Sequence, residues 1–272
     1  MTTAHDPLPL PRRLSAVLLA ALCLGCPSAR ADETPKAVGI TAVSARVSKE
    51  YVRKRTADGS FEPEEYGFWD AGVYRGPFRD TSVTRLSFTD VARVIADALR
   101  SQNYVPARGT DSEKLLIVLQ WGTTITGEDY SGRHGPGAHD DQVDLINARI
   151  LGYEGEALIG TDFGGFARAV GGLSQHRRDL LAEIEENRYF VVMRAFDFQV
   201  LRRENRHRLL WETRFSINEP DNRFDRALPV IAAYASRYFG QDSSGLLRTQ
   251  VPDGQVNVGV TKPLGTVELP GR

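Results

Sequence analysis

The sequence predicts an α+β fold, built as a mostly antiparallel sheet with amphipathic helices packed on one face, plus a glycine-rich insertion. Two observations support this prediction. Strand-like segments with alternating or continuous apolar residues are separated by helical segments that each carry one apolar stripe. Their order is strand, helix, strand, insertion, hairpin, helix, and such elements bury their apolar surfaces by packing helices on a sheet. We expect one domain at residues 32–248, with the insertion at 126–188.

The first half of this domain contains two extended segments and a helix. Residues 38–47 alternate apolar with small or polar side chains, and residues 66–74 are rich in aromatic side chains. We expect these two segments to pair as a first hairpin. Residues 89–102 predict an amphipathic helix, with Thr89 as its N-terminal cap and Asn103 as its left-handed stop.

The second half predicts a buried strand, a hairpin and two helices. Val200 and Leu209 belong to the two alternating segments of the hairpin, which the polar turn RRENRH joins. Leu209 should share one face with the buried residues that follow it at every second position. The tail from Thr249 is rich in proline, glycine and polar residues, so we expect it to be loose. The expected elements are a strand at 114–121, a helix at 174–187 capped by Ser174, strands at 189–201 and 209–217, and a helix at 225–239.

The first 31 residues are typical of a bacterial export signal. Arg12 and Arg13 precede the apolar run at 14–24, which is too short to cross a bilayer as a helix. Small residues at the two positions that signal peptidase inspects then favour cleavage after Ala31. The alternative is cleavage before Cys26, because Cys23-Leu24-Gly25-Cys26 is similar to a lipobox and would leave Cys26 to carry lipid.

Charge and cysteine content exclude several classes of function. Removing residues 1–31 takes away three arginines and one aspartate and changes the net charge from −1 to −3, so nucleic acid is not an expected partner. No second apolar run is long enough to span a membrane. Both cysteines lie in or beside the signal, which excludes a disulfide, a cysteine nucleophile and an iron–sulfur cluster in the mature chain.

One part of the chain resembles a known group of proteins. The stretch TDVARVIADALRSQNYVPA, followed by EKLLIVLQWG, is similar to uncharacterised bacterial cell-envelope proteins, many of them lipoproteins. They share a helix that ends in an Asn-Tyr turn (here Asn103-Tyr104), an apolar strand, a hairpin with a tryptophan (here Trp211) and a last helix. The resemblance covers about half of the mature chain and implies an envelope location and an α+β fold. It implies no catalytic residue.

A candidate metal site lies in the glycine-rich segment GEDYSGRHGPGAHDDQVD. His134, His139 and Asp140 offer nitrogen and oxygen ligands for a divalent ion such as Zn²⁺. Neither histidine has the spacing of a known zinc motif, and a solvated loop is the alternative interpretation. No phosphate-binding, dinucleotide or acyl-enzyme motif is present, so we expect no cofactor.

Two features suggest an interaction surface. Trp69, in YGFWDAGVY, could present an exposed aromatic edge to a protein or glycan, whereas Trp121 and Trp211 lie in apolar strand patterns that predict core positions. The basic cluster Arg202, Arg203 and Arg206 could bind an anionic lipid or glycan, or could simply keep a turn solvated.

The sequence thus predicts an exported envelope protein that is a non-enzymatic binding or assembly module. Its expected partner is another envelope protein or a glycan, and it would contact a membrane only through a lipid anchor on Cys26. The alternative is a periplasmic hydrolase that uses a metal held by His134, His139 and Asp140.

Overall fold

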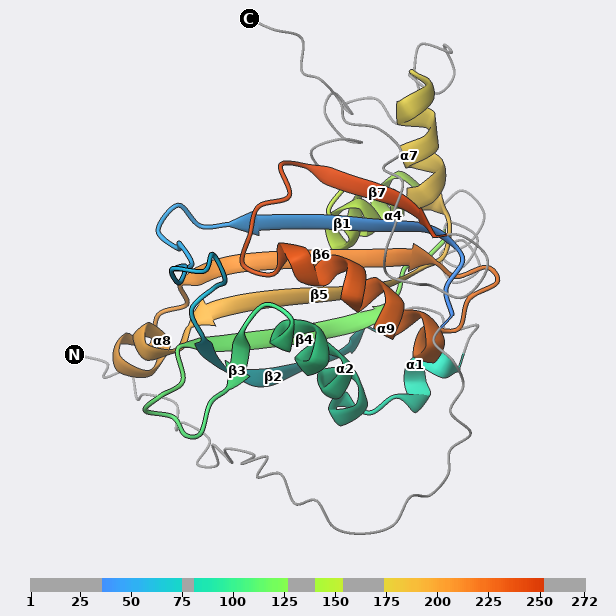
Figure 1. Cartoon of the computed structure of the whole chain (residues 1–272). Coiled ribbons are helices and arrows are strands. Elements are labelled where there is room, and N and C mark those ends of the chain that lie inside the picture. The colour runs from blue at the N-terminus through green and yellow to red at the C-terminus, as the bar shows by residue number, and fades with distance from the viewer. Residues whose placement is uncertain (1–35, 75–80, 127–139, 154–173, 252–272) are drawn as a thin grey trace, which may run out of the picture.

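The computed structural model describes residues 36–74, 81–126, 140–153 and 174–251 (Figure 1). Within them, seven strands form one mixed sheet in the order β3-β2-β4-β5-β6-β1-β7. The pairs β2-β3 and β2-β4 are parallel, and the other four pairs are antiparallel. The strands are β1 Gly39–Val47, β2 Glu64–Tyr74, β3 Tyr104–Pro106, β4 Leu115–Thr123, β5 Arg188–Asp197, β6 Leu209–Asn218 and β7 Leu246–Val251. The α+β prediction is confirmed.

Three helices cover the first face of this sheet, in front of the strands in Figure 1: α1 Ser82–Arg85, α2 Phe88–Arg100 and α9 Phe224–Ala235. Every second residue of β4, β5 and β6 points into the main core beneath these helices. Trp121 and Trp211 are each 1% exposed there, as the apolar pattern predicted. Trp211 stacks on Phe239, with 6.2 Å between the ring centroids.

Two further helices lie on the opposite, second face: α4 Asp140–Leu151 and α7 Gln175–Glu185. Both come from the segment predicted as an insertion, so helices pack on both faces and not on one. They cover a smaller core on β5 and β1, made of Ala42, Ala148, Leu151, Tyr153, Leu180, Ile184, Phe190 and Val192.

The predicted first hairpin is wrong. β1 pairs with β6 and β7, whereas β2 pairs with β3 and β4, so three strands separate β1 from β2 in the sheet. Alternation shows which side of a strand is buried but does not identify its partner. Here β1 fills the place between β6 and β7, far along the chain.

The second predicted hairpin pairs as expected but differs at its tip. The predicted strand at 189–201 ends at Asp197, whose side chain accepts a hydrogen bond from the Val200 N–H and caps α8 (Phe198–Glu204). A register shift next to Phe196 then pairs Leu209 with Phe196 on the second face. Leu209 is therefore 42% exposed and does not share the buried face of Trp211.

Two predictions about where elements begin or end also need correction. Ser87, not Thr89, caps α2, because its hydroxyl accepts from the Asp90 N–H while the Asp90 carboxylate accepts from the Ser87 N–H. The chain from Thr249 to Val251 completes β7 and is not loose. Asn103, with φ of 59°, and Ser174, which caps α7, behave as predicted.

Candidate functional site

The structure contains a row of side chains that crosses five neighbouring strands on the second face. The pairing registers place Trp69 of β2 beside Val118 of β4, then Arg194 of β5, Glu212 of β6 and Arg46 of β1. Each of these residues alternates with residues of the main core, so all five point to the second face. With strands about 4.8 Å apart, this cross-strand row spans about 19 Å.

Trp69 is the exposed end of the row. Its side chain is 54% exposed, the highest value among the tryptophans, and Val118 beside it is half-buried. An exposed tryptophan offers a partner a large apolar ring face and an indole N–H, and covering that face would remove a large apolar area from water. The sequence left open whether Trp69 is exposed, and the structure places it at the surface; its role in an interface stays a prediction.

In the middle of the row, two arginines form ion pairs with the same carboxylate, that of Glu212. Nε of Arg194 donates to Oε2 of Glu212 at 2.6 Å, and a second arginine, Arg214, holds Oε1 at 2.8 Å. Both oxygens of Glu212 are thus engaged by arginines other than Arg46, its direct neighbour on β1. The Arg46 side chain has no hydrogen-bond or ion-pair partner within the described structure, and it is exposed.

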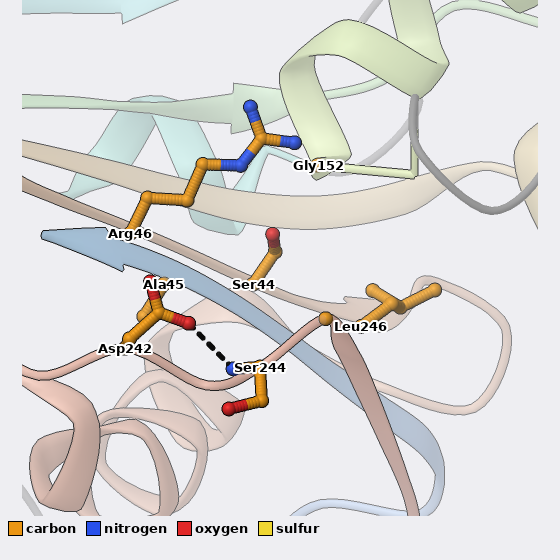
Figure 2. A pocket seen from close by; sticks show the side chains of 8 residues that line it. Ser44, Ala45, Arg46, Gly152, Asp242, Ser244 and Leu246 are labelled. Atoms are coloured by element: carbon orange, nitrogen blue, oxygen red, sulfur yellow. Dashed lines mark hydrogen bonds between the residues drawn. The ribbon is translucent and has the colours of Figure 1, made fainter. Parts of the chain in front are cut away.

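A cavity of about 250 Å³ adjoins the Arg46 end of the row (Figure 2). Ser44 and Arg46 form its β1 side, and Gly152 closes it where α4 ends. In Figure 2 the Ser44 hydroxyl and the Arg46 guanidinium both extend toward Gly152. The remaining lining residues are Ala45, Asp242, Ser244, Gly245 and Leu246.

The loop before β7 is fixed firmly against β1, so this side of the cavity has a defined shape. The Ser243 hydroxyl accepts from the Ala45 N–H at 2.9 Å and donates to the Gly245 carbonyl at 2.6 Å. Oδ1 of Asp242 accepts from the Ser244 N–H at 2.7 Å, as the dashed line in Figure 2 shows. The other carboxylate oxygen of Asp242 has no hydrogen bond within the described chain and can accept one from a ligand.

Gly152 brings α4 close to β1 at the cavity. Its φ of 81° is a left-handed conformation that favours glycine, and a Cβ atom here would lie 2.5 Å from the Ser44 Cβ. Asn147 holds the same helix in place, since its amide donates to the carbonyls of Ile125 and Ile184 at 2.6 and 3.1 Å. Any larger residue at position 152 would therefore move α4 and change the cavity.

A buried charge network fixes α7 to the sheet beneath this face. Glu183 accepts from the Tyr153 hydroxyl at 2.6 Å and from Nε of Arg248 at 2.9 Å, and lies 3.7 Å from Nη1 of Arg188. Arg188 is fully buried and also donates to the Ser216 hydroxyl and the Ile40 carbonyl. All charged members except Arg248 are at most 5% exposed, so the network positions helices and does not face a ligand.

The arginines predicted as an interaction surface lie elsewhere, at the end of the sheet where β5 leads into β6. Arg202 pairs with Asp111 at 2.5 Å, and Arg206 pairs with Glu204 at 2.8 Å. Arg203 is exposed in the last turn of α8. Paired acids reduce the positive charge of this cluster, and the structure does not place it on the row that contains Trp69.

The candidate metal site stays a prediction. His134 and His139 lie outside the described residues, and Asp140 begins α4 but its side chain is not described. Cys26 also lies outside them. In the parts of the chain that are described, no cluster of three or more histidine, cysteine or acidic side chains is arranged to hold a metal ion.

The sequence indicated part of the cross-strand row but not the whole. In the sequence, the alternation along residues 209–217 puts Glu212 and Arg214 on the side opposite the apolar Trp211 and Phe215. Arg46, Arg194 and Ser44 were not recognised, because their place beside Glu212 depends on strand pairings between distant segments. Nothing in the sequence around the loop residue Asp242 indicated that it would line a cavity.

Comparison with known proteins gives no family. No protein-family model and no curated protein matches the chain. Among solved structures, a PDZ domain protein from Parabacteroides distasonis ATCC 8503 aligns with 13% identity and a TM-score of 0.40. The alignment covers 78% of this chain and 39% of that one, so this chain spans well under half the length of its structural neighbour.

The described helices include none that is long and apolar enough to cross a membrane.

Proposed function

We propose that this protein is exported and acts as a binding module of the cell envelope, which holds another envelope component against the second face of its sheet. The single observation that carries the proposal is the cross-strand row, with Trp69 more than half exposed at one end and the unpaired Arg46 at the other. Side chains of this kind on a rigid sheet form a binding surface with both stacking and hydrogen-bonding groups.

Export is supported by the N-terminal pattern, in which two arginines precede an apolar run and a small-residue cleavage sequence. The intact mass of the mature protein from its native host tests this. A chain that begins at Asp32 corresponds to a free exported protein, and an acylated chain that begins at Cys26 corresponds to a membrane-anchored one. A mature chain that retains residues 1–31 would contradict export.

Binding is tested by sedimenting the full-length protein with isolated cell walls and with outer-membrane vesicles from the same host. We expect the wild type to sediment with one of these fractions and Trp69→Ala to remain in the supernatant. Val52→Ala is the matched control, because Val52 is 81% exposed but belongs to the loop after β1. Equal sedimentation of all three proteins would contradict the proposal.

A further inference from the structure

We propose that the cross-strand row and its cavity bind an acidic glycan chain, which lies across the strands from Trp69 to Arg46. This inference rests on the proposed function and adds the chemical class of the partner. It follows from three properties of the surface: its shape, its hydrogen-bonding groups and its charge.

The shape of the surface suits an extended chain. The row is continuous over five strands and about 19 Å long, which exceeds the size of a single sugar and matches several linked units. The indole ring of Trp69 provides an apolar platform at one end, where the C–H face of a sugar ring can stack. The cavity of about 250 Å³ at the other end can enclose one sugar or its substituent.

The polar groups suit hydroxyl-bearing ligands. Arg46 and Arg194 can donate, Asp242 can accept, and the hydroxyl of Ser44 can do both. A sugar hydroxyl also donates and accepts, so it can use such a mixed set, whereas an apolar protein partner would leave these groups without hydrogen bonds at a cost. Between Trp69 and the cavity the row offers only Val118 as a further apolar contact, which favours a glycan over a polypeptide.

The charge of the surface favours an acidic substituent at the cavity. Glu212 is shared by Arg194 and Arg214, so that cluster carries one excess positive charge. Arg46 adds a second cation without a partner in the described structure, and Asp242 lines the same cavity from the loop before β7. A carboxylate beside Arg46 would form a charge-assisted pair, and neighbouring sugar hydroxyls could donate to Asp242.

The test uses tryptophan fluorescence of the full-length protein. The chain has three tryptophans, and two of them, Trp121 and Trp211, are each 1% exposed, so a ligand on the second face should alter mainly the emission of Trp69. The acidic probe is peptidoglycan glycan strands freed of peptides, which carry a carboxylate on alternate sugars. The neutral probe is a chito-oligosaccharide of similar length.

We expect the wild type to bind the acidic strands saturably and the neutral chain more weakly. Arg46→Gln should lower the affinity for the acidic strands about tenfold. The same change should have little effect on the affinity for the neutral chain. Trp69→Ala should weaken both about tenfold or more, and Trp69→Phe should restore most of the affinity, measured by calorimetry because the fluorescent group is lost. Circular dichroism confirms that each variant is folded.

Three outcomes would overturn the inference. They are no change in Trp69 emission with either probe, an equal loss of affinity for both probes in Arg46→Gln, and an unchanged affinity for both probes in Trp69→Ala. If cell walls or vesicles still sediment the protein through Trp69 while neither glycan binds, the proposed function stands and the partner is of another class, such as a polypeptide. If nothing sediments it, both proposals fail.

Discussion

Replacing Glu183 by glutamine should destabilise the protein strongly although the two side chains have the same shape. Glu183 is 5% exposed and interacts with two arginines, one of them the fully buried Arg188. Removing one charge of a buried ionic network typically costs 3–5 kcal/mol, because the remaining charges stay buried without compensation. We expect about 3 kcal/mol, the lower end of that range, since glutamine can still accept from the Tyr153 hydroxyl and Arg248 is partly exposed.

The assay is urea unfolding at neutral pH, followed by far-ultraviolet circular dichroism, with the free energy of unfolding extrapolated to water. Glu186→Gln is the matched control three residues along the same segment. Its side chain is exposed, so its effect should stay within about 0.5 kcal/mol. Tyr153→Phe should cost about 2 kcal/mol, because it removes a hydrogen bond to a charged group.

A double-mutant cycle of these two changes should show coupling, since Tyr153 and Glu183 are in direct contact. A stabilising role of the charge network would be contradicted if Glu183→Gln is no more destabilising than Glu186→Gln. That result would mean that α7 is held by its apolar contacts alone, and that the position of α4 and the cavity does not depend on the charge network.

Three further predictions concern other parts of the fold. Ser87→Ala removes the capping box with Asp90 and should lower the free energy of unfolding by about 1 kcal/mol in urea unfolding; no loss would mean that α2 needs no cap. Gly240→Ala should lower the melting temperature and cost more than about 1 kcal/mol, because φ is 67° and the new Cβ would meet the Tyr104 hydroxyl. Burial raises the pKa of Glu113 to about 7, above its ordinary 4.5, so the folded state retains a proton that the unfolded state loses. The free energy of unfolding should therefore fall as the pH rises from about 4.5 to 7 and then level off. The slope should be well under 1.4 kcal/mol per pH unit, the value for a fully buried carboxyl, because Glu113 is only partly buried. Glu113→Gln should abolish that slope, and an unchanged slope would mean that another group causes it.

Elements whose pattern repeats locally could be predicted from the sequence. The burial of Trp211, the stop at Asn103 and the cap at Ser174 each depend on side chains a few residues apart, which the sequence displays directly. The cap of α2 was misplaced by two residues because Ser87 and Thr89 are both good capping residues.

Features that depend on pairing between distant segments could not be predicted. The place of β1 between β6 and β7 joins residues about 160 to 210 positions apart, and alternation alone does not select these partners. The bulge beside Phe196 reverses the direction of Leu209, which a strict period of two cannot anticipate. The candidate site follows from these pairings, since they bring Arg46 next to Glu212.

Binding at the cross-strand row can be tested by site-specific photocrosslinking in intact cells of the native host, with a benzophenone amino acid at position 69. We expect an adduct with an envelope component from position 69 and none from position 52, which is 81% exposed but lies outside the second face. Arg194→Glu in the same chain should abolish the adduct, because it reverses the charge in the middle of the row. Identical products from both positions, or an adduct that Arg194→Glu leaves unchanged, would contradict binding at the cross-strand row.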